Sequence, residues 1–486
     1  MKKSTILAFL LALATILGAC GGPVATTPAT VPGTAPATSP ATADTGRYEG
    51  LGKQDFDGRE FIIAGANEAC FQYAENGSVI QQAYYEAYMN VEEELNCVIT
   101  IATDAGDIYQ AAQPSLMAGD YYADVFAPAF FWSGYFIENS YAEDLNQFVQ
   151  LQLDQPWWED AATEMSTFNG KTYAIKGALN PSIDRHWVVF FNKAMIENLG
   201  LTSPYEHVRN NTWTWDTFET YMRKATFDVD GDNYMSADDS YGWGGPFSDS
   251  AFVMWMSAGQ PVFEVAEDGT SARLAMGDAK SGDIARRIRS MMFDSGYVYD
   301  LKDGESWVVS FEEQFPNDRC LFTFEHLEYA NYTYWVEMTS DFGIVPVPKY
   351  DANQEKYSTY LDHYPSVLLI PRGLENPEDS AVLLEALAQE CYRTTYPNIV
   401  DNYKDNLFRD EESAEMLDLI LDDTGRYFEL STLFGWSSGG VYGAGVVLLA
   451  NVCIFNGADF SAEYEQNAEA TQLAADELLA KLNNLS

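Results

Sequence analysis

Basic residues are scarce in this chain of 486 residues: 27 lysines and arginines stand against 73 aspartates and glutamates, which gives a formal net charge of −46. A surface of this sign repels phosphate backbones and anionic lipids, so the sequence argues against nucleic-acid binding. Histidine is rarer still, with four residues in the whole chain. None of them begins an H-E-x-x-H zinc motif, and no glycine-rich phosphate loop is present. The motifs of zinc hydrolases and of nucleotide-binding proteins are therefore missing.

Paired cysteines and long apolar runs are also missing. Five cysteines follow Cys20, an odd number, and none belongs to a C-x-x-C pair. The count leaves room for one or two disulfides outside the cytoplasm but does not indicate a redox centre, so we expect mostly core cysteines. Beyond the amino terminus, no segment reaches the ~18 consecutive apolar residues of a membrane-spanning helix.

The amino terminus has the layout of an export signal: Lys2 and Lys3, an apolar run, then small residues before a cysteine. Leu17 to Cys20 resembles a bacterial lipobox, which predicts cleavage before Cys20 and lipid attachment to it. The alternative is an ordinary secretory signal with a chance cysteine. Residues 21–50 follow as a tether, because prolines punctuate an alanine- and threonine-rich tract that cannot bury a core. We therefore expect an extracytoplasmic protein that its lipid holds on the cell membrane.

The rest of the chain is too long for one core, since single cores stop growing near ~250–300 residues, so we expect two lobes. A short apolar strand at Phe61–Ala64 precedes a helix over Val79–Leu95, a strand over Cys97–Ala102 and another over Ala123–Ala127. This alternation predicts right-handed crossovers and a mainly parallel α/β sheet. Ligands of such sheets bind outside the carboxyl ends of the strands, so the loops after the first and third strands are expected to face a ligand.

A loop crowded with aspartates is similar to the calcium-binding loop of an EF-hand. Carboxylates at loop positions one, three, five and twelve suit a hard cation, and position seven supplies a backbone carbonyl. Asn233 replaces the turn glycine, although asparagine tolerates a positive φ, and the last ligand is aspartate instead of glutamate. The alternative is a solvated acidic turn. The predicted ligands of a structural calcium ion are Asp228, Asp230, Asp232, Tyr234, Ser236 and Asp239.

Four short motifs stand in order along the chain. Asn169–Tyr173 is a G-K-x-Y hairpin, and Phe190–Leu201 approaches the pattern Y-Y-N-K-x-x-F-E-x-x-G-L. Trp213–Phe218 approaches W-T-W-D-E-F, and Asp341–Lys349 reads D-F-G-I-x-P-x-P-K. Together these motifs, followed in the third case by the acidic loop, resemble extracellular solute-binding proteins of bacterial ABC importers, in the mostly sugar-binding family 1. The resemblance runs from about Asp55 to the carboxyl terminus.

The resemblance implies a two-lobed α/β fold of the type II periplasmic-binding-protein kind, with the ligand in a cleft between the lobes. It assigns residues 51–180 and 308–362 to lobe 1, and residues 181–307 and 363–486 to lobe 2. It also implies the function, which is to capture a mono- or oligosaccharide and deliver it to the transmembrane subunits of an ABC permease. We expect a monomer, no covalent chemistry and no cofactor besides the calcium ion.

A sugar presents apolar C–H faces and hydroxyl groups, so a sugar cleft needs flat aromatic rings together with carboxylates or amides. Trp132, Trp243 and Trp255 are the predicted ring platforms, because each lies in or beside a loop expected to face the cleft. For any one tryptophan, core packing is at least as common a role. Glu68 and Glu325 are predicted to accept hydrogen bonds from sugar hydroxyls.

Three alternatives remain open. A secreted carbohydrate hydrolase needs two opposed carboxylates about 5–10 Å apart, but among 73 acidic residues some such pair always looks plausible. A cell-surface adhesion module is suggested only by the anchor and the tether. A binding protein for a non-sugar solute, such as a peptide, is the third.

Overall fold

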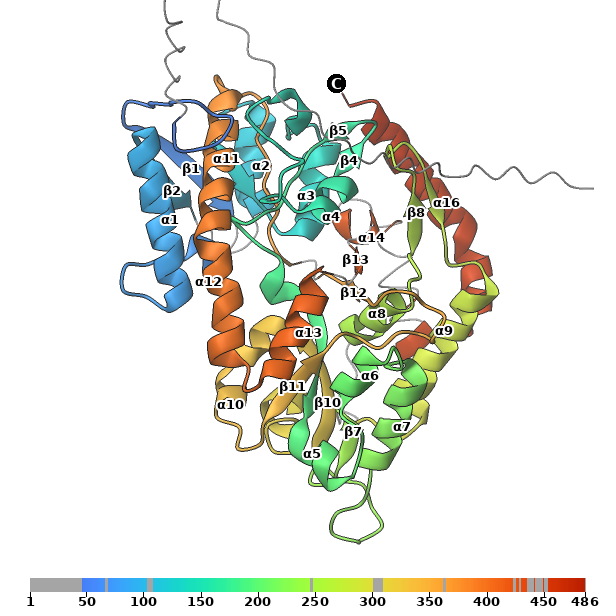
Figure 1. Cartoon of the computed structure of the whole chain (residues 1–486). Helices are drawn as coiled ribbons and strands as arrows, with labels where there is room; N and C mark the ends of the chain where they lie inside the picture. The colour runs from blue at the N-terminus through green and yellow to red at the C-terminus, as the bar shows by residue number, and fades with distance from the viewer. Residues whose placement is uncertain are drawn as a thin grey trace, which may run out of the picture. The chain divides into compact units, whose positions relative to one another are not determined.

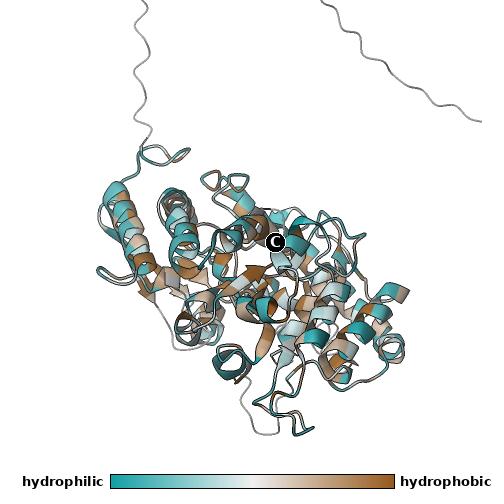
Figure 2. Ribbon diagram, turned by 60° about the horizontal axis from the view of Figure 1, so that its bottom comes forward, coloured by the Kyte–Doolittle hydropathy of each residue, from teal (hydrophilic) through white to brown (hydrophobic). Residues whose placement is uncertain are grey.

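Two β-sheets organise the part of the chain that the structure, a computed structural model, describes (Figure 1). It describes residues 46–65, 69–102, 108–244, 248–299, 309–361, 364–422, 425–427, 430–434, 441, 449 and 453–485. The predicted signal and nearly all of the predicted tether lie outside these residues, as do Cys20 and Glu68. Figure 2 shows that hydrophobic residues concentrate on the strands and on the inward sides of the helices.

The first sheet is parallel, with the strand order β2-β1-β3. It consists of β1 (Arg59–Gly65), β2 (Cys97–Ala102) and β3 (Val125–Ala127), and α1 (Val79–Leu95) connects the first two strands. The parallel α/β arrangement predicted from the sequence is confirmed, and α1 and β2 have the predicted bounds. We call the elements around this sheet the first lobe.

The second sheet has the strand order β11-β6-β10-β7. Its strands are β6 (Trp187–Asn192), β7 (Tyr241–Trp243), β10 (Cys320–His326) and β11 (Phe342–Val345). β6 runs antiparallel to both of its neighbours, and all six of its residues are buried. β11 is an edge strand and is followed by Pro346 and Pro348, a residue type that sheets tolerate at their edges. The elements around this sheet form the second lobe.

The strand pairing corrects the lobe boundaries that the resemblance implied. Residues 308–362 were expected in lobe 1, but β10 and β11 both pair with β6 of the second lobe. Residues 363–486 were expected in lobe 2, yet Leu369 bridges to Phe126 in the first lobe, and α11 (Pro377–Arg393) packs on α1. The sequence indicated where the strands lie but not which strands they pair with.

A buried carboxylate fixes α11 in the first lobe. Glu385, fully buried in the middle of α11, accepts hydrogen bonds from the indole N–H groups of Trp157 (2.9 Å) and Trp158 (3.0 Å). The backbone N–H of Gln152 (3.2 Å) and the side-chain amide of Gln389 (3.0 Å) donate to the same carboxylate. Burial raises the pKa of Glu385, while these donors lower it. A buried charge needs such partners, and here they join residues more than two hundred positions apart.

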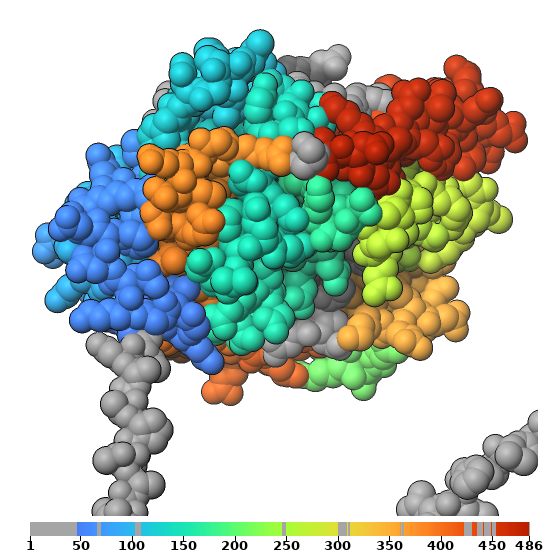
Figure 3. Space-filling view, turned by 90° about the horizontal axis from the view of Figure 1, so that it is seen from above, coloured from blue at the N-terminus to red at the C-terminus, as the bar shows by residue number. Residues whose placement is uncertain are grey.

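The long carboxyl-terminal helix α16 (Phe460–Asn483) contacts elements of both lobes. On one side Gln472 donates to the carbonyl of Ala272 in β9 (2.8 Å), and α16 also packs on α9. α16 also packs on α3 and β4, and just beyond its end Lys171 donates to the carbonyl of Leu485 (2.6 Å). Figure 3 shows α16, in red, lying along the yellow-green and teal segments.

The hairpin expected at Asn169 and Gly170 is present: both residues have a positive φ, 50° and 72°, as a tight two-residue turn requires. The five cysteines after Cys20 are all buried, which agrees with the expected core role. Among the described residues, no helix combines the length and the apolar character needed to cross a membrane.

The remaining elements are mostly short helices and two-stranded ribbons that surround the two sheets. They are α2 (Ile108–Ala118), α3 (Phe130–Glu138), α4 (Asp160–Met165), β4 (Thr167–Phe168), β5 (Lys171–Thr172), α5 (Lys193–Asn198), α6 (Pro204–Arg209), α7 (Trp215–Ala225), α8 (Ser248–Ser257), β8 (Phe263–Val265), β9 (Ala272–Leu274), α9 (Ala279–Arg289), α10 (Thr333–Val336), β12 (Ser358–Tyr360), α12 (Thr395–Asn402), α13 (Glu411–Asp422), β13 (Gly425–Tyr427) and α14 (Leu430–Leu433).

Candidate ligand-binding site

A pocket of about 460 Å³ is lined by residues of both lobes. Ser78 and Ile80 come from the start of α1 in the first lobe, and a group that flanks β6 and β10 comes from the second lobe. The residues that line this interlobe pocket are Ser78, Ile80, Asp184, Glu328, Tyr329, Asn331, Tyr332, Ile399, Asn402, Tyr403 and Leu407.

The antiparallel pairing of β6 and β10 brings the second-lobe residues of the pocket together. Because His326 at the end of β10 lies opposite Trp187 at the start of β6, the turns that adjoin these ends meet at one edge of the sheet. The rings of Trp187 and His326 lie edge to face, 4.2 Å apart. Asp184 therefore reaches the same pocket as Glu328, although 144 positions separate them in the sequence.

Charged and hydroxyl groups in and beside the pocket are bonded to each other. The Arg185 guanidinium donates to the Glu328 carboxylate at 2.5 Å. The hydroxyl of Tyr403 donates to Asp184 at 2.7 Å. These bonds hold both carboxylates of the pocket in fixed positions.

Glu325, the last residue but one of β10, differs from the nearby carboxylates of Asp184 and Glu328 in its hydrogen bonding. Its side chain is buried, and within the described part of the chain its Oε1 atom has no hydrogen-bond partner. Burial raises the pKa of Glu325 well above its usual value, and the nearby carboxylates of Asp249 and Glu328 raise it further. The indole N–H of Trp187 is another buried polar group without a partner among the described residues. One unused acceptor and one unused donor are what a hydroxyl-bearing ligand satisfies.

Comparison with known proteins agrees with this geometry. Residues 73–311 match the family described as bacterial extracellular solute-binding protein. By this sequence match, residues 73–311 belong to a family of solute-binding proteins. No curated protein sequence matches this chain.

Solved structures of solute-binding proteins share the fold at low sequence identity. The galacto-N-biose/lacto-N-biose I-binding protein of an ABC transporter from Bifidobacterium longum aligns with a TM-score of 0.61 and 12% identity, over 88% of this chain and 99% of its own. The cyclic α-maltosyl-1,6-maltose-binding protein from Arthrobacter globiformis aligns with a TM-score of 0.59 and 13% identity, over 87% and 99%. An ABC substrate-binding protein from Listeria monocytogenes in complex with cycloalternan gives 0.55 and 14%, over 87% and 98%. The predicted two-lobed fold of periplasmic binding proteins is thereby confirmed.

The three tryptophans that the sequence nominated do not meet in the interlobe pocket. Trp243 has no exposed surface and packs on Phe324, with ring centroids 4.6 Å apart. Trp255 is equally buried, against Phe460 of α16. Both rings are core rings, which argues against their predicted role as platforms. Trp132, in α3, is half-buried and stacks on Tyr109 at 5.2 Å.

Sequence reasoning selected Glu325 but missed the tyrosines beside it. Tyr329, Tyr332 and Tyr403 line the pocket, yet the sequence analysis singled out tryptophans as the aromatic candidates. A usable signal was present, because Tyr329 and Tyr332 follow the carboxyl end of β10, a position at which α/β sheets commonly bind ligands. Asp184 carries no comparable sequence signal.

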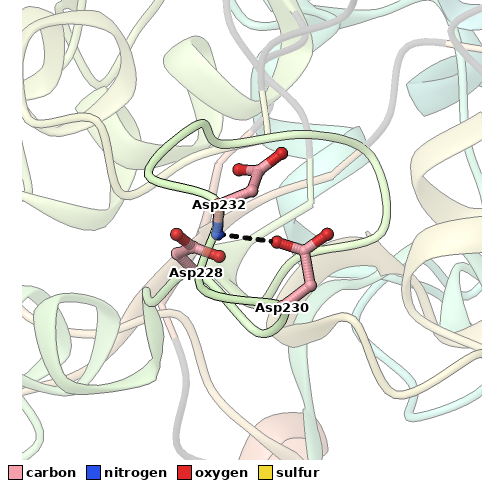
Figure 4. Close-up of side chains that lie close together, drawn as sticks. All are labelled: Asp228, Asp230 and Asp232. Atoms are coloured by element: carbon pink, nitrogen blue, oxygen red, sulfur yellow. Dashed lines mark hydrogen bonds between the residues drawn. The ribbon is translucent and has the colours of Figure 1, made fainter.

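The acidic loop lies beyond α7 and brings three of its predicted calcium ligands together (Figure 4). One carboxylate oxygen from each of Asp228, Asp230 and Asp232 lies within 4.8 Å of the others. Asn233 has a φ of 64°, so it takes the left-handed conformation of the glycine that it replaces. Three convergent carboxylates suit a hard cation, which prefers oxygen ligands.

The other predicted ligands of the loop are placed differently. Asp239 does not join the three carboxylates; it accepts hydrogen bonds from the backbone N–H groups of Val229 (2.8 Å) and Ser236 (2.6 Å). These bonds tie the end of the loop to its start. The side chain of Tyr234 is exposed, and its backbone N–H donates to the Asp232 carboxylate at 2.7 Å.

The raised pKa of Glu325 makes a prediction about pH. Between the usual carboxyl pKa of about 4.3 and the raised value, the folded protein keeps a proton that the unfolded chain releases, so stability falls as the pH rises, by up to about 1.4 kcal/mol per unit. In the Glu325→Gln variant this part of the slope disappears, because glutamine does not titrate. Urea unfolding between pH 5 and pH 8 measures the slopes, with Glu264→Gln, an exposed site, as the control. Identical slopes in the wild type and in Glu325→Gln would contradict a raised pKa for Glu325.

Proposed function

We propose that this chain captures a carbohydrate in the interlobe pocket and delivers it to the membrane permease of an ABC importer. The observation that carries the proposal is the buried edge of β10 and β6, where the Glu325 carboxylate and the Trp187 indole N–H lack partners among the described residues. Neither group is among the residues that line the pocket, but the lining residue Tyr329 lies close enough to Glu325 for this carboxyl to raise the pKa of the tyrosine. Rings, an acceptor and a donor are the groups that recognise the apolar faces and the hydroxyls of a sugar.

The solved structures support the same class of ligand. The three compared above bind, by their names, lacto-N-biose, cyclic maltosyl-maltose and cycloalternan, all of them oligosaccharides. A pocket that both lobes line also suits the cycle of solute capture and release that an importer requires. A bound solute favours the closed arrangement of the lobes, in which both of them contact the solute. That closed arrangement is what a permease recognises.

An enzymatic function has less support. The matching family is a family of binding proteins. Residues 435–439 spell the G-x-S-x-G of a nucleophile elbow, but that motif needs a strand directly before it, whereas α14 ends at Leu433 just before these residues. Residues 435–439 themselves lie outside the described residues.

A panel of mono- and oligosaccharides tests the carbohydrate assignment. At least one sugar should raise the melting temperature, because a ligand that binds only the folded state stabilises it, by about 2.7 kcal/mol at a hundredfold excess over Kd. Tyr332→Ala, in the pocket, should reduce this shift, whereas Tyr334→Ala, an exposed neighbour outside the pocket, should not. A flat response to all sugars together with a shift for peptides or polyamines would sink the carbohydrate assignment.

The extracytoplasmic location of the family supports a further part of the proposal, which is that Cys20 carries a lipid anchor and residues 21–50 form a tether to the folded part. Metabolic labelling with a radioactive fatty acid should mark the wild type and not a Cys20→Ser variant. Equal labelling of both proteins would show that the lipid is attached elsewhere.

The acidic loop is proposed to hold a structural calcium ion through Asp228, Asp230 and Asp232, away from the solute. Calcium should then raise the melting temperature with or without sugar, and a chelator should reverse the shift. The double variant Asp230→Asn, Asp232→Asn should lose the response, while Asp238→Asn, an exposed neighbour outside the cluster, should keep it. If chelation of the wild type changes nothing, the loop is a solvated acidic turn.

A further inference from the structure

We propose that a groove formed mainly by the first lobe docks an extended segment of a partner protein, one that carries a basic and an acidic side chain on either side of an apolar one. The groove consists of two pockets, of about 560 Å³ and about 580 Å³, that share Trp157 and Tyr392 in their lining. We call it the side groove. It has no lining residue in common with the interlobe pocket, so it is a second site.

Aromatic rings form the centre of the side groove. The ring of Trp157 is buried, and its indole N–H donates to Glu385 at 2.9 Å. Tyr392 is 37% exposed, and its ring centroid lies 6.4 Å from that of Trp157 and 6.5 Å from that of Tyr396. Rings that are held from behind and open in front give an apolar side chain a contact surface at little cost in conformational entropy.

Carboxylates line the first pocket of the groove. Asp160 and Glu164 lie one turn apart on α4, and both are exposed. The carboxylate of Glu159, beside them, accepts from the backbone N–H of Ser182 at 2.7 Å and from its hydroxyl at 2.6 Å, and both donors are neutral. Among the described residues that line this pocket, none is basic. A lysine or arginine of a partner can therefore place its charge beside the carboxylates and its methylene groups against the rings.

Arginines line the second pocket. The buried carboxylate of Glu390 binds the guanidinium groups of both Arg47 and Arg393, at 2.5 Å and 3.1 Å, and these two side chains are 39% and 44% exposed. Glu49, also in the lining, has an exposed side chain. Because one buried carboxylate fixes two arginines, each with five N–H groups, donors remain for a carboxylate of the partner.

The two pockets together favour a peptide segment over a small ion. A small ion fills one pocket and leaves the other pocket and the rings between them uncovered. An extended chain advances ~3.3–3.6 Å per residue, so side chains a few residues apart reach both pockets. The first pocket is also lined by Pro181, in the connection to β6, and by Leu421 of α13, which packs on β11. A docked segment therefore contacts both lobes.

An array of synthetic heptapeptides tests the proposal. Each peptide carries a lysine and an aspartate on either side of a leucine, in both orders and at every spacing, and the affinity of the best peptide is measured by fluorescence anisotropy. It should bind roughly tenfold more tightly than its forms with glutamine for the lysine or asparagine for the aspartate. Added salt should reduce this advantage, because the charged side chains of the groove are partly exposed.

A matched pair of double variants tests the contribution of the carboxylates. Asp160→Asn with Glu164→Gln should weaken the best peptide about tenfold and its glutamine form much less, because the glutamine form has no charge for the carboxylates to attract. Glu465→Gln with Glu469→Gln, exposed one turn apart on α16, should change neither affinity. Equal weakening of both peptides by the first double variant would contradict the charge contact.

Tyrosine variants separate the side groove from the solute site. Tyr392→Ala should weaken the best peptide severalfold, whereas Tyr332→Ala, in the interlobe pocket, should leave its affinity unchanged. The opposite pattern would place the peptide in the interlobe pocket and overturn the side groove. An array without a bound peptide, or spermidine bound as tightly as the best peptide, would overturn it too. The carbohydrate function is tested by the sugar panel, so either proposal can fail while the other stands.

Discussion

The second lobe depends on one constraint, the central position of β6 between two strands that come much later in the chain. β6 has neighbours on both sides, β10 and β11, and every one of its residues is buried. A fully buried strand cannot leave its backbone N–H and C=O groups unpaired without a large cost. The second sheet is therefore incomplete until Val345 is available, and the pocket, which lies where β6 begins and β10 ends, also needs Ile399 to Leu407, which come later in the chain.

The same pairing explains the electrostatic character of the site. Antiparallel strands place the start of one beside the end of the other, so the acidic residues that adjoin both ends accumulate at one edge instead of being spread over the surface. Arg185 donates to the Glu328 carboxylate there. The Glu385 network shows the contrasting solution, in which indole and amide donors surround one buried carboxylate. The Oε1 atom of Glu325 has no such donor among the described residues.

Local signals in the sequence predicted the positions of helices and strands well. The sequence did not predict which strands pair with one another. α1 and β2 have the expected bounds because the apolar periodicity that predicts them is local. The pairing of β10 and β11 with β6, and hence the lobe to which each segment belongs, depends on residues more than a hundred positions apart. Trp243 and Trp255 were misjudged for a related reason: a large aromatic ring in a loop-rich region looks the same in sequence whether Phe324 or a solute covers it.

Helix α16 has a mechanical consequence. It is a single rod that packs on β9 and α9 and also on α3 and β4; Gln472 in its middle donates to β9, and Lys171 donates to the carbonyl of Leu485 just beyond its end. A rod fastened to two bodies fixes the distance between its attachment points. Any change in the angle between the lobes must therefore pivot about α16, bend it, or detach one of its ends. The carboxyl terminus is in this sense a strut that limits which directions of lobe motion are available, and a reporter fused beyond Leu485 travels with the first lobe.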